Sequence, residues 1–306
     1  MLTTSMDSKT APPPDIAART LAALLRDIVA SGRKAVETPD ISDADAVHDL
    51  RKALKGWRAM MRLLTPTVGE EAEAMRLEAR DIAREIAAAR DGQAAQEALS
   101  DLADAGDDLP RVSERARAAI SERLVALRMS AEAVSLTPER KARIQGMWIR
   151  ADAVIGRWPL ARFDRAEAAR QLAASYRRVS KAIPGNWSKA SPEALHKFRQ
   201  RVVEHRYQME LTDPLWPKVM RVWVSEAQRL RDRLGSHHDL VILHHLTEPH
   251  QPLSRWRSQL APLIAARQAA HVVAAKRLTG RLFAETPKAF FRRLASLWEH
   301  CAETAN

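Results

Sequence analysis

The chain has 306 residues, of which 46% are hydrophobic and 28% are charged, so it can bury the core of a globular protein. Lysine and arginine outnumber aspartate and glutamate by 49 to 38, which gives a formal net charge of +11 at pH 7. A surplus of this size is too large to be incidental to binding, and it favours polyanions: nucleic acid, an anionic membrane surface or free phosphate polymers.

The sequence carries no feature of a secreted or membrane-spanning protein. Cys301 is the single cysteine, so no intramolecular disulfide can form, which fits a reducing compartment. The opening residues, MLTTSMDSKTAPPPD, lack the charged and then apolar pattern of a signal peptide, and no apolar run approaches about 18 residues. We therefore expect a cytoplasmic protein without membrane association. Its first 14 residues are predicted to be disordered.

The predicted elements are all helices. Alanine, leucine, arginine and glutamate dominate, and the alternation typical of strands is missing, so we predict an all-α protein. Ser42 and Ser191 suit helix N-caps, Pro66 and Pro214 suit helix ends or turns, and Pro287 suits the first turn of the last helix. The predicted helices cover residues 15–36, 42–64, 69–103, 111–135, 138–156, 162–183, 190–211, 216–246, 255–285 and 287–303.

Five basic residues of the second predicted helix point in nearly one direction. They follow one another at intervals of three, four, three and four residues, which confines them to an arc of about 80° on the helix. Apolar residues fill the adjacent arc, so the basic side chains begin where the core face ends. The five are His48, Arg51, Lys55, Arg58 and Arg62.

A solvated basic face with local salt bridges is the simplest alternative for such a stripe. However, the arc lacks acidic partners three or four residues away, and like charges at that spacing repel by a few tenths of a kcal/mol per pair. A cluster of like charge needs a compensating anion. The stripe therefore predicts an anion-binding groove between helices.

Part of this stripe recurs 148 residues later. The segment AVHDLRKALKGWRAMMRLLTP (46–66) aligns with ALHKFRQRVVEHRYQMELTDP (194–214), and seven of the 21 positions are identical, where composition alone gives about one or two. The same offset pairs Asp91 with Asp239 without a gap. The chain is therefore predicted to be a tandem duplication of a helical unit. The basic positions that recur are His196, Arg199 and Arg206.

These motifs resemble a known family. Each copy begins a helix with His-x-x-Arg and is followed about 40 residues later by a leucine-rich helix that ends in RD or LGSHHD, which is similar to the CHAD family, the conserved histidine α-helical domain. The resemblance covers nearly all of residues 15–304. It implies two four-helix bundles, over 15–160 and 161–306, that are related by a pseudo-two-fold axis and together form one CHAD domain. It also implies a central basic channel that binds inorganic polyphosphate.

The resemblance assigns polyphosphate contacts to both histidine helices. Guanidinium groups would pair with phosphate oxygens, Lys55 would add a point charge, and the histidines would donate hydrogen bonds. Val203 and Glu210 replace Lys55 and Arg62 in the second copy, which therefore supplies fewer cations. Polyphosphate granules are a candidate partner. The assigned residues are His48, Arg51, Lys55, Arg58, Arg62, His196, Arg199 and Arg206.

Further arginines follow on the third predicted helix. Arg76, Arg80 and Arg84 recur every four residues, and Arg90 precedes the shared Asp91. Acidic residues interleave with the first three, so a solvated face is as well supported as a ligand-lining one. These four arginines are candidates of second rank.

Neither catalysis nor a metal site is predicted. No carboxylate, serine or cysteine beside the two histidines recurs in both copies, so a catalytic partner is missing. In HHDLVILHH (237–245) the histidines are one, six, seven or eight residues apart, unlike the spacing of H-E-x-x-H. We therefore expect a binding protein without enzyme activity, metal or cofactor. Nucleic-acid binding through the same groove is the alternative, and a phosphotransferase or polyphosphate hydrolase is the third.

Overall fold

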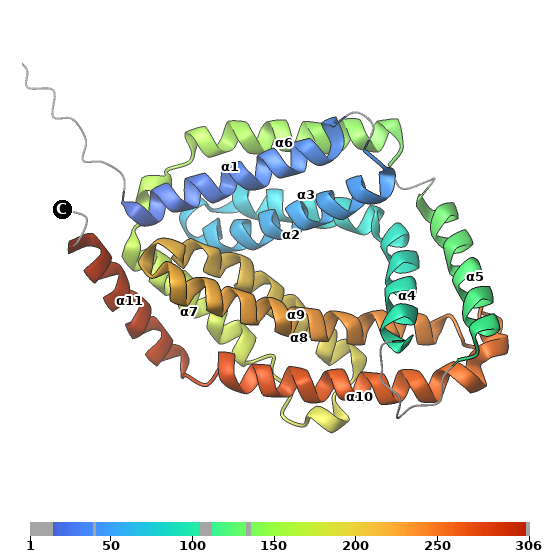
Figure 1. Ribbon diagram of the computed structural model, residues 1–306. Coiled ribbons are helices and arrows are strands. Elements are labelled where there is room, and N and C mark those ends of the chain that lie inside the picture. Colours follow the sequence, from blue (N-terminus) through green and yellow to red (C-terminus); the bar gives the residue numbers. More distant parts are fainter. Residues whose placement is uncertain (1–14, 39–40, 104–111, 133–135, 304–306) are drawn as a thin grey trace, which may run out of the picture.

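The computed structural model describes residues 15–38, 41–103, 112–132 and 136–303, and within these ranges the regular secondary structure is entirely helical (Figure 1). The predicted segment 1–14 lies outside the described residues. The α-helices are α1 (Ile16–Glu37), α2 (Asp43–Val68), α3 (Glu70–Glu85), α4 (Ala87–Ala103), α5 (Glu114–Glu132), α6 (Pro138–Arg157), α7 (Arg165–Ser180), α8 (Pro192–Met209), α9 (Pro217–His245), α10 (Arg257–Leu282) and α11 (Pro287–Glu303). Short 3₁₀ helices follow at η1 (Leu160–Arg162), η2 (Trp187–Lys189), η3 (Glu210–Leu215) and η4 (Ser254–Trp256).

Local side chains begin the two histidine helices as predicted. The Ser42 side chain accepts a hydrogen bond from the Asp45 backbone N–H at 3.1 Å, and Ser191 accepts one from Ala194 at 3.2 Å. Each bond satisfies a backbone donor that the first turn of a helix leaves open. Pro287 is the first residue of α11, where its missing N–H costs nothing.

Two predicted helix boundaries were wrong. Pro66 does not end α2, which continues to Val68 and stops at Gly69, whose φ of 88° is a conformation that glycine adopts without strain. A proline in the last turn removes only one backbone hydrogen bond, so the helix tolerates it there. The predicted helix 69–103 is two helices, because the chain leaves helical geometry at Ile86, with φ −98° and ψ 13°.

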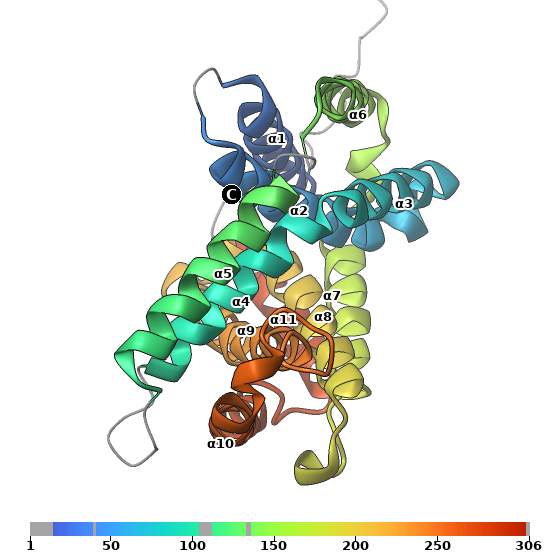
Figure 2. The ribbon, with the colours of Figure 1, turned by 90° about the vertical axis from the view of Figure 1, so that its right-hand side faces the viewer.

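The helices form two groups that share one large hydrophobic core, and α4 and α5 extend from the first group to the second. α1, α2, α3 and α6 lie together on one side, and α7 to α11 lie on the other (Figure 1). After the break at Ile86, α4 runs away from the first group, pairs with α5 and packs against α9 (Figure 2). Buried residues of α4 and α5 consequently share one hydrophobic core with residues of α9 and α10. The division into repeats at residues 15–160 and 161–306 stays a prediction.

The two histidine helices, α2 and α8, are in direct contact. Gln208 donates a buried hydrogen bond from Nε2 to the Ala59 carbonyl oxygen at 2.7 Å, and the Tyr207 hydroxyl donates to the Lys52 carbonyl oxygen at 3.4 Å. These bonds join α8 to the backbone of α2. They bring together two motifs that are far apart in the sequence.

Among the described helices, none combines the length and the apolar character that crossing a lipid bilayer requires.

Candidate functional site

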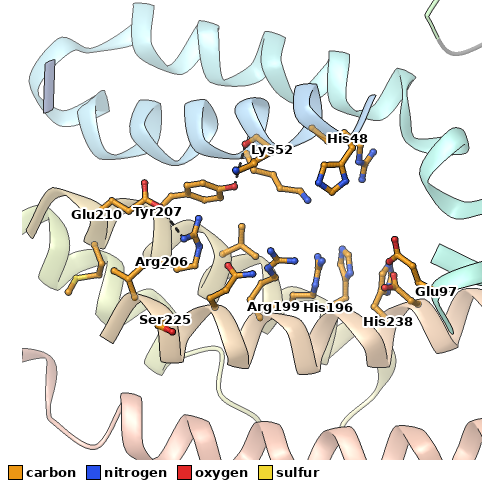
Figure 3. A pocket seen from close by; sticks show the side chains of 18 of the residues that line it. His48, Lys52, Glu97, His196, Arg199, Arg206, Tyr207, Glu210, Ser225 and His238 are labelled. Carbon is orange, nitrogen blue, oxygen red and sulfur yellow. Dashed lines mark hydrogen bonds and ion pairs between the residues drawn. The ribbon is translucent and has the colours of Figure 1, made fainter. Parts of the chain in front are cut away.

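A cavity of about 930 Å³ lies between α2 and α8, and residues of α4 and α9 extend it. Figure 3 shows His48 and Lys52 on one wall, with His196, Arg199 and Arg206 on the facing wall. The basic stripe of α2 and the basic stripe of α8 each contribute residues to the cavity lining. The basic residues that line the cavity are His48, Arg51, Lys52, Lys55, His196, Arg199, Arg206, Arg221, Arg231 and His238.

Six of the eight residues that the sequence assigned to an anion site line this one cavity. They are His48, Arg51, Lys55, His196, Arg199 and Arg206. The structure does not bring the other two, Arg58 and Arg62, into the cavity lining. Instead, Arg62 Nε lies 3.1 Å from Glu204 Oε2, and Glu204 is on a face of α8 that does not line the cavity. The stripe on α2 is therefore split: His48, Arg51 and Lys55 line the cavity, whereas Arg58 and Arg62 lie outside its lining.

His196 offers a hydrogen-bond donor at the cavity wall. Its Nε2 lies 2.8 Å from the side-chain nitrogen of Gln200, and in the tautomer that accepts a hydrogen bond from this nitrogen the ring proton is on Nδ1. Nδ1 is buried and has no hydrogen-bond partner among the described residues. The ring also contacts His238, with 4.3 Å between centroids. An acceptor on a ligand would therefore satisfy a donor that is costly to leave alone.

The surroundings of His196 disfavour its charged form while the cavity holds no anion. Burial lowers the pKa of His196, and the nearby Arg199 guanidinium lowers it further. An anion beside the ring would act in the opposite direction. The protonation of His196 would therefore be coupled to the binding of an anion beside it.

Carboxylates also line the cavity. Glu210 lies 3.0 Å from Arg206 Nη1, and Arg206 stacks over the Tyr207 ring at 4.1 Å. Burial raises the pKa of Glu210, although Arg206 and Lys52 oppose this. The shared aspartates, Asp91 and Asp239, also line the cavity. The cavity is thus basic along its two long walls and mixed in charge elsewhere.

Three of the four arginines of second rank, Arg76, Arg80 and Arg84, do not line the cavity. Arg76 donates to Glu73 at 2.8 Å, Arg80 donates to Asp81 at 2.9 Å, and Arg84 lies 3.6 Å from Asp81. The side chain of Arg90 lies outside the part of the chain that the structure describes. The interleaved acidic residues therefore pair with three of these arginines.

Several lining residues were not identified from the sequence. Lys52 is four residues after His48, so the helical spacing alone was enough to include it. Arg231 and Tyr207 were missed because the repeat does not conserve their character: their counterparts at the same offset are Ala83 and Ala59. His238 was weighed as a metal ligand and was not assigned to the anion site, but it lines the cavity and its ring contacts that of His196.

The described residues contain no group of three or more histidine, cysteine, aspartate or glutamate side chains arranged to hold a metal ion. Of the histidines in 237–245, His237 is buried, His238 lies in the cavity, and His245 is 2.9 Å from Glu248. These three histidines therefore lie in different surroundings.

The fold and the cavity define an all-helical protein in which two histidine-bearing helices share a basic cavity. The chain belongs to the CHAD domain family, whose model matches residues 3–76 and 19–248. It is similar in fold to the crystal structure of the CHAD domain from the plant Ricinus communis, with a TM-score of 0.55, 16% sequence identity and coverage of 96% of each chain. A comparison with curated proteins gave no match. The resemblance inferred from the two histidine motifs is confirmed.

Proposed function

We propose that this chain binds inorganic polyphosphate in the cavity between α2 and α8 without transforming it. The observation that carries the proposal is the convergence of both basic stripes on one cavity, with His48, Arg51 and Lys55 on one wall. Guanidinium groups hold phosphate oxygens through paired, charge-assisted hydrogen bonds, and lysine and histidine add further donors. Many modest contacts along a linear polymer would supply the affinity.

The chemistry of the lining supports binding rather than catalysis. Among the described lining residues, the hydroxyl groups are those of Ser225 and Tyr207. The Tyr207 hydroxyl donates to a backbone carbonyl oxygen, and burial raises its pKa, so it is a poor nucleophile. The donor set for a protein-bound metal is also missing from the described residues. A phosphotransferase or hydrolase thus has little support in this cavity.

Nucleic-acid binding is the alternative that shares phosphate chemistry. Proteins that hold single-stranded nucleic acid usually stack bases on aromatic side chains. In the described lining, Tyr207 is the one phenylalanine, tyrosine or tryptophan, and Arg206 already covers its ring. The cavity therefore offers charge without a platform for bases, which favours a phosphate polymer.

Competition between polyanions tests the proposal. Labelled polyphosphate is bound at fixed salt and displaced with unlabelled polyphosphate, single-stranded DNA or double-stranded DNA at equal phosphate concentration. We expect polyphosphate to displace the label at much lower concentration than either DNA. Because binding releases condensed counterions, the logarithm of the affinity should also fall linearly with the logarithm of salt concentration. Equal displacement by DNA would contradict the choice of ligand.

A matched pair of variants tests the place of binding. Arg51→Gln with Arg199→Gln removes one cation from each cavity wall and should weaken polyphosphate binding at least about tenfold. Arg229→Gln with Arg233→Gln removes the same charge from exposed positions of α9 outside the lining, and should change the affinity much less. Equal effects of the two pairs, with helical circular dichroism retained, would place binding outside the cavity.

A further inference from the structure

Three arginines form ion pairs with Glu204 on a side of α8 that does not line the cavity, and three more arginines interact electrostatically with Glu204 or with one another beside it. They come from four helices: α2, α3, α7 and α8. We call this group the Glu204 cluster. Its arginines are Arg58, Arg62, Arg76, Arg80, Arg178 and Arg201.

Glu204 is bound on both carboxylate oxygens. Oε2 lies 3.1 Å from Arg62 Nε and 3.1 Å from Arg201 Nη1, and Oε1 lies 3.1 Å from Arg178 Nη2. The Glu204 side chain is 14% exposed, so these contacts are partly shielded from water. One carboxylate thus joins guanidinium groups from three helices.

The cluster has more positive than negative charge. Beyond Glu204, its carboxylates are Glu73, which pairs with Arg76, and Asp81, which pairs with Arg80. Six guanidinium groups therefore face three carboxylates among these residues, which leaves an excess of three positive charges. Arg58 experiences this excess directly: burial lowers its pKa first, and Arg76 and Arg62 lower it further. A further anion would offset this excess of positive charge in a partly buried site.

Two donors of the cluster are buried without a partner. Among the described residues, neither Nε of Arg58 nor Nε of Arg178 has a hydrogen-bond acceptor. A salt-bridge network that serves stability alone normally satisfies its buried donors, because each one left open costs free energy. The cluster also remains within reach of a ligand, since the side chains of Arg62, Arg80 and Arg201 are 29–34% exposed.

We propose that the Glu204 cluster is a second anion site, which binds phosphate or a short phosphoanhydride such as pyrophosphate. The ligand class follows from the donors, because guanidinium groups from several directions match the oxygens of a tetrahedral dianion. None of the cluster arginines lines the cavity, so this inference goes beyond the proposed function and does not depend on it. The anion comes from one of two sources: free phosphate, or a segment of a polyphosphate chain that extends along α2 beyond the cavity.

Pyrophosphate titration tests the second site in a chain whose cavity is already weakened. In the variant Arg51→Gln with Arg199→Gln, we expect calorimetry to show pyrophosphate binding that persists. Adding Arg58→Gln and Arg178→Gln should abolish that residual binding, whereas adding Arg229→Gln and Arg233→Gln, with the same change in charge, should preserve it. Loss of all pyrophosphate binding in the cavity variant, or equal effects of the two additions, would overturn the proposal.

Folding and the source of the anion are controlled separately. If the added pair does not fold by circular dichroism, Arg201→Gln replaces it, because this side chain is at the exposed edge of the cluster, and it should weaken the residual binding at least about fivefold. Unchanged residual binding in a folded Arg201→Gln variant counts against the site.

A cluster variant with an intact cavity distinguishes the two sources of the anion. Weaker binding of long polyphosphate indicates that a chain segment occupies the cluster. Unchanged binding of long polyphosphate, with loss of one pyrophosphate equivalent, indicates a free anion. If the cluster binds DNA but not pyrophosphate, the proposed ligand class is wrong.

Discussion

Arg206, in the last turn of α8, and Glu210, the first residue of η3, form an ion pair inside the cavity, with 3.0 Å between Arg206 Nη1 and Glu210 Oε1. The Glu210 carboxylate thus accepts from an Arg206 N–H group that could otherwise donate to a phosphate oxygen. Glu210 is also the residue that replaces a basic one when the two motif segments are aligned. The pair therefore sets a limit on how strongly the second histidine helix attracts an anion.

Glu210→Gln should tighten polyphosphate binding. The change removes a negative charge from the cavity and releases Arg206, and one partly shielded charge-assisted contact corresponds to roughly a three- to tenfold gain in affinity. Displacement of labelled polyphosphate measures the gain. Glu226→Gln is the matched control, because Glu226 pairs with Arg229 outside the cavity lining. Equal affinities of the two variants would show that Glu210 does not compete with the ligand.

Polyphosphate affinity should rise as the pH falls from about 7 towards 5. In the empty protein burial and Arg199 hold the pKa of His196 below its usual value, and a bound anion favours the imidazolium, so binding is accompanied by proton uptake. Glu210, whose pKa is raised by burial, adds to the trend in the lower part of this range because its protonation removes a negative charge. His196→Gln should flatten the pH profile, whereas His245→Gln, which alters an exposed histidine paired with Glu248, should not.

The link between α4 and α10 should contribute stability that acid removes. Asp101 accepts hydrogen bonds from Arg267 at 2.7 Å and from His271 at 2.7 Å. Burial raises the pKa of Asp101, but the bonds from His271 and Arg267 outweigh burial and lower it to about 2. A depressed carboxylate pKa means that the contribution is complete above about 3.8 and is lost as the pH falls through about 2.

Asp101→Asn should therefore lower the free energy of unfolding by about 2 kcal/mol at pH 7. Urea unfolding measured at several pH values checks this, and the difference from the parent should shrink as the pH falls from about 4 towards 2. Asp232→Asn, at an exposed position of α9, is the control and should change stability little. A constant difference across the pH range would assign the effect to packing and not to ionisation.

Gly32→Ala should destabilise the first group of helices. Gly32 is buried in α1, and a Cβ atom there would overlap the indole ring of Trp148 on α6. Overpacking of this kind costs about 1–3 kcal/mol. Gly156→Ala on α6 meets no atom within 4 Å and should be neutral or slightly stabilising, because alanine favours the helix. Thermal unfolding of the two variants gives the comparison, and equal midpoints would argue against close packing at Gly32.

The helices followed from local properties of the sequence, and for that reason most of their bounds were predicted to within a few residues. The break at Ile86 was not, because the residues around it are good helix formers and the new direction of α4 comes from packing against α9. The direction of the basic stripe on α2 was predictable from spacing. That α8 separates Arg58 and Arg62 from the cavity depends on how two helices meet, which no periodicity contains.

The Glu204 cluster shows the same limit. Arg201 and Glu204 are three residues apart on α8 and resemble an ordinary surface pair. Their importance comes from Arg62 and Arg178, which reach the same carboxylate from other helices. Contacts between residues so distant in the chain need the fold before they can be seen.

The bond from Gln208 to the Ala59 carbonyl oxygen has a consequence for how this protein tolerates change. Its acceptor belongs to the main chain of α2, so the bond does not use any side chain of that helix. The separation of the two cavity walls is thereby independent of which side chains α2 presents to the ligand. Basic residues on α2 can be added, removed or moved by one turn at constant wall spacing, which makes this helix a suitable place to engineer selectivity for anions of different length and charge.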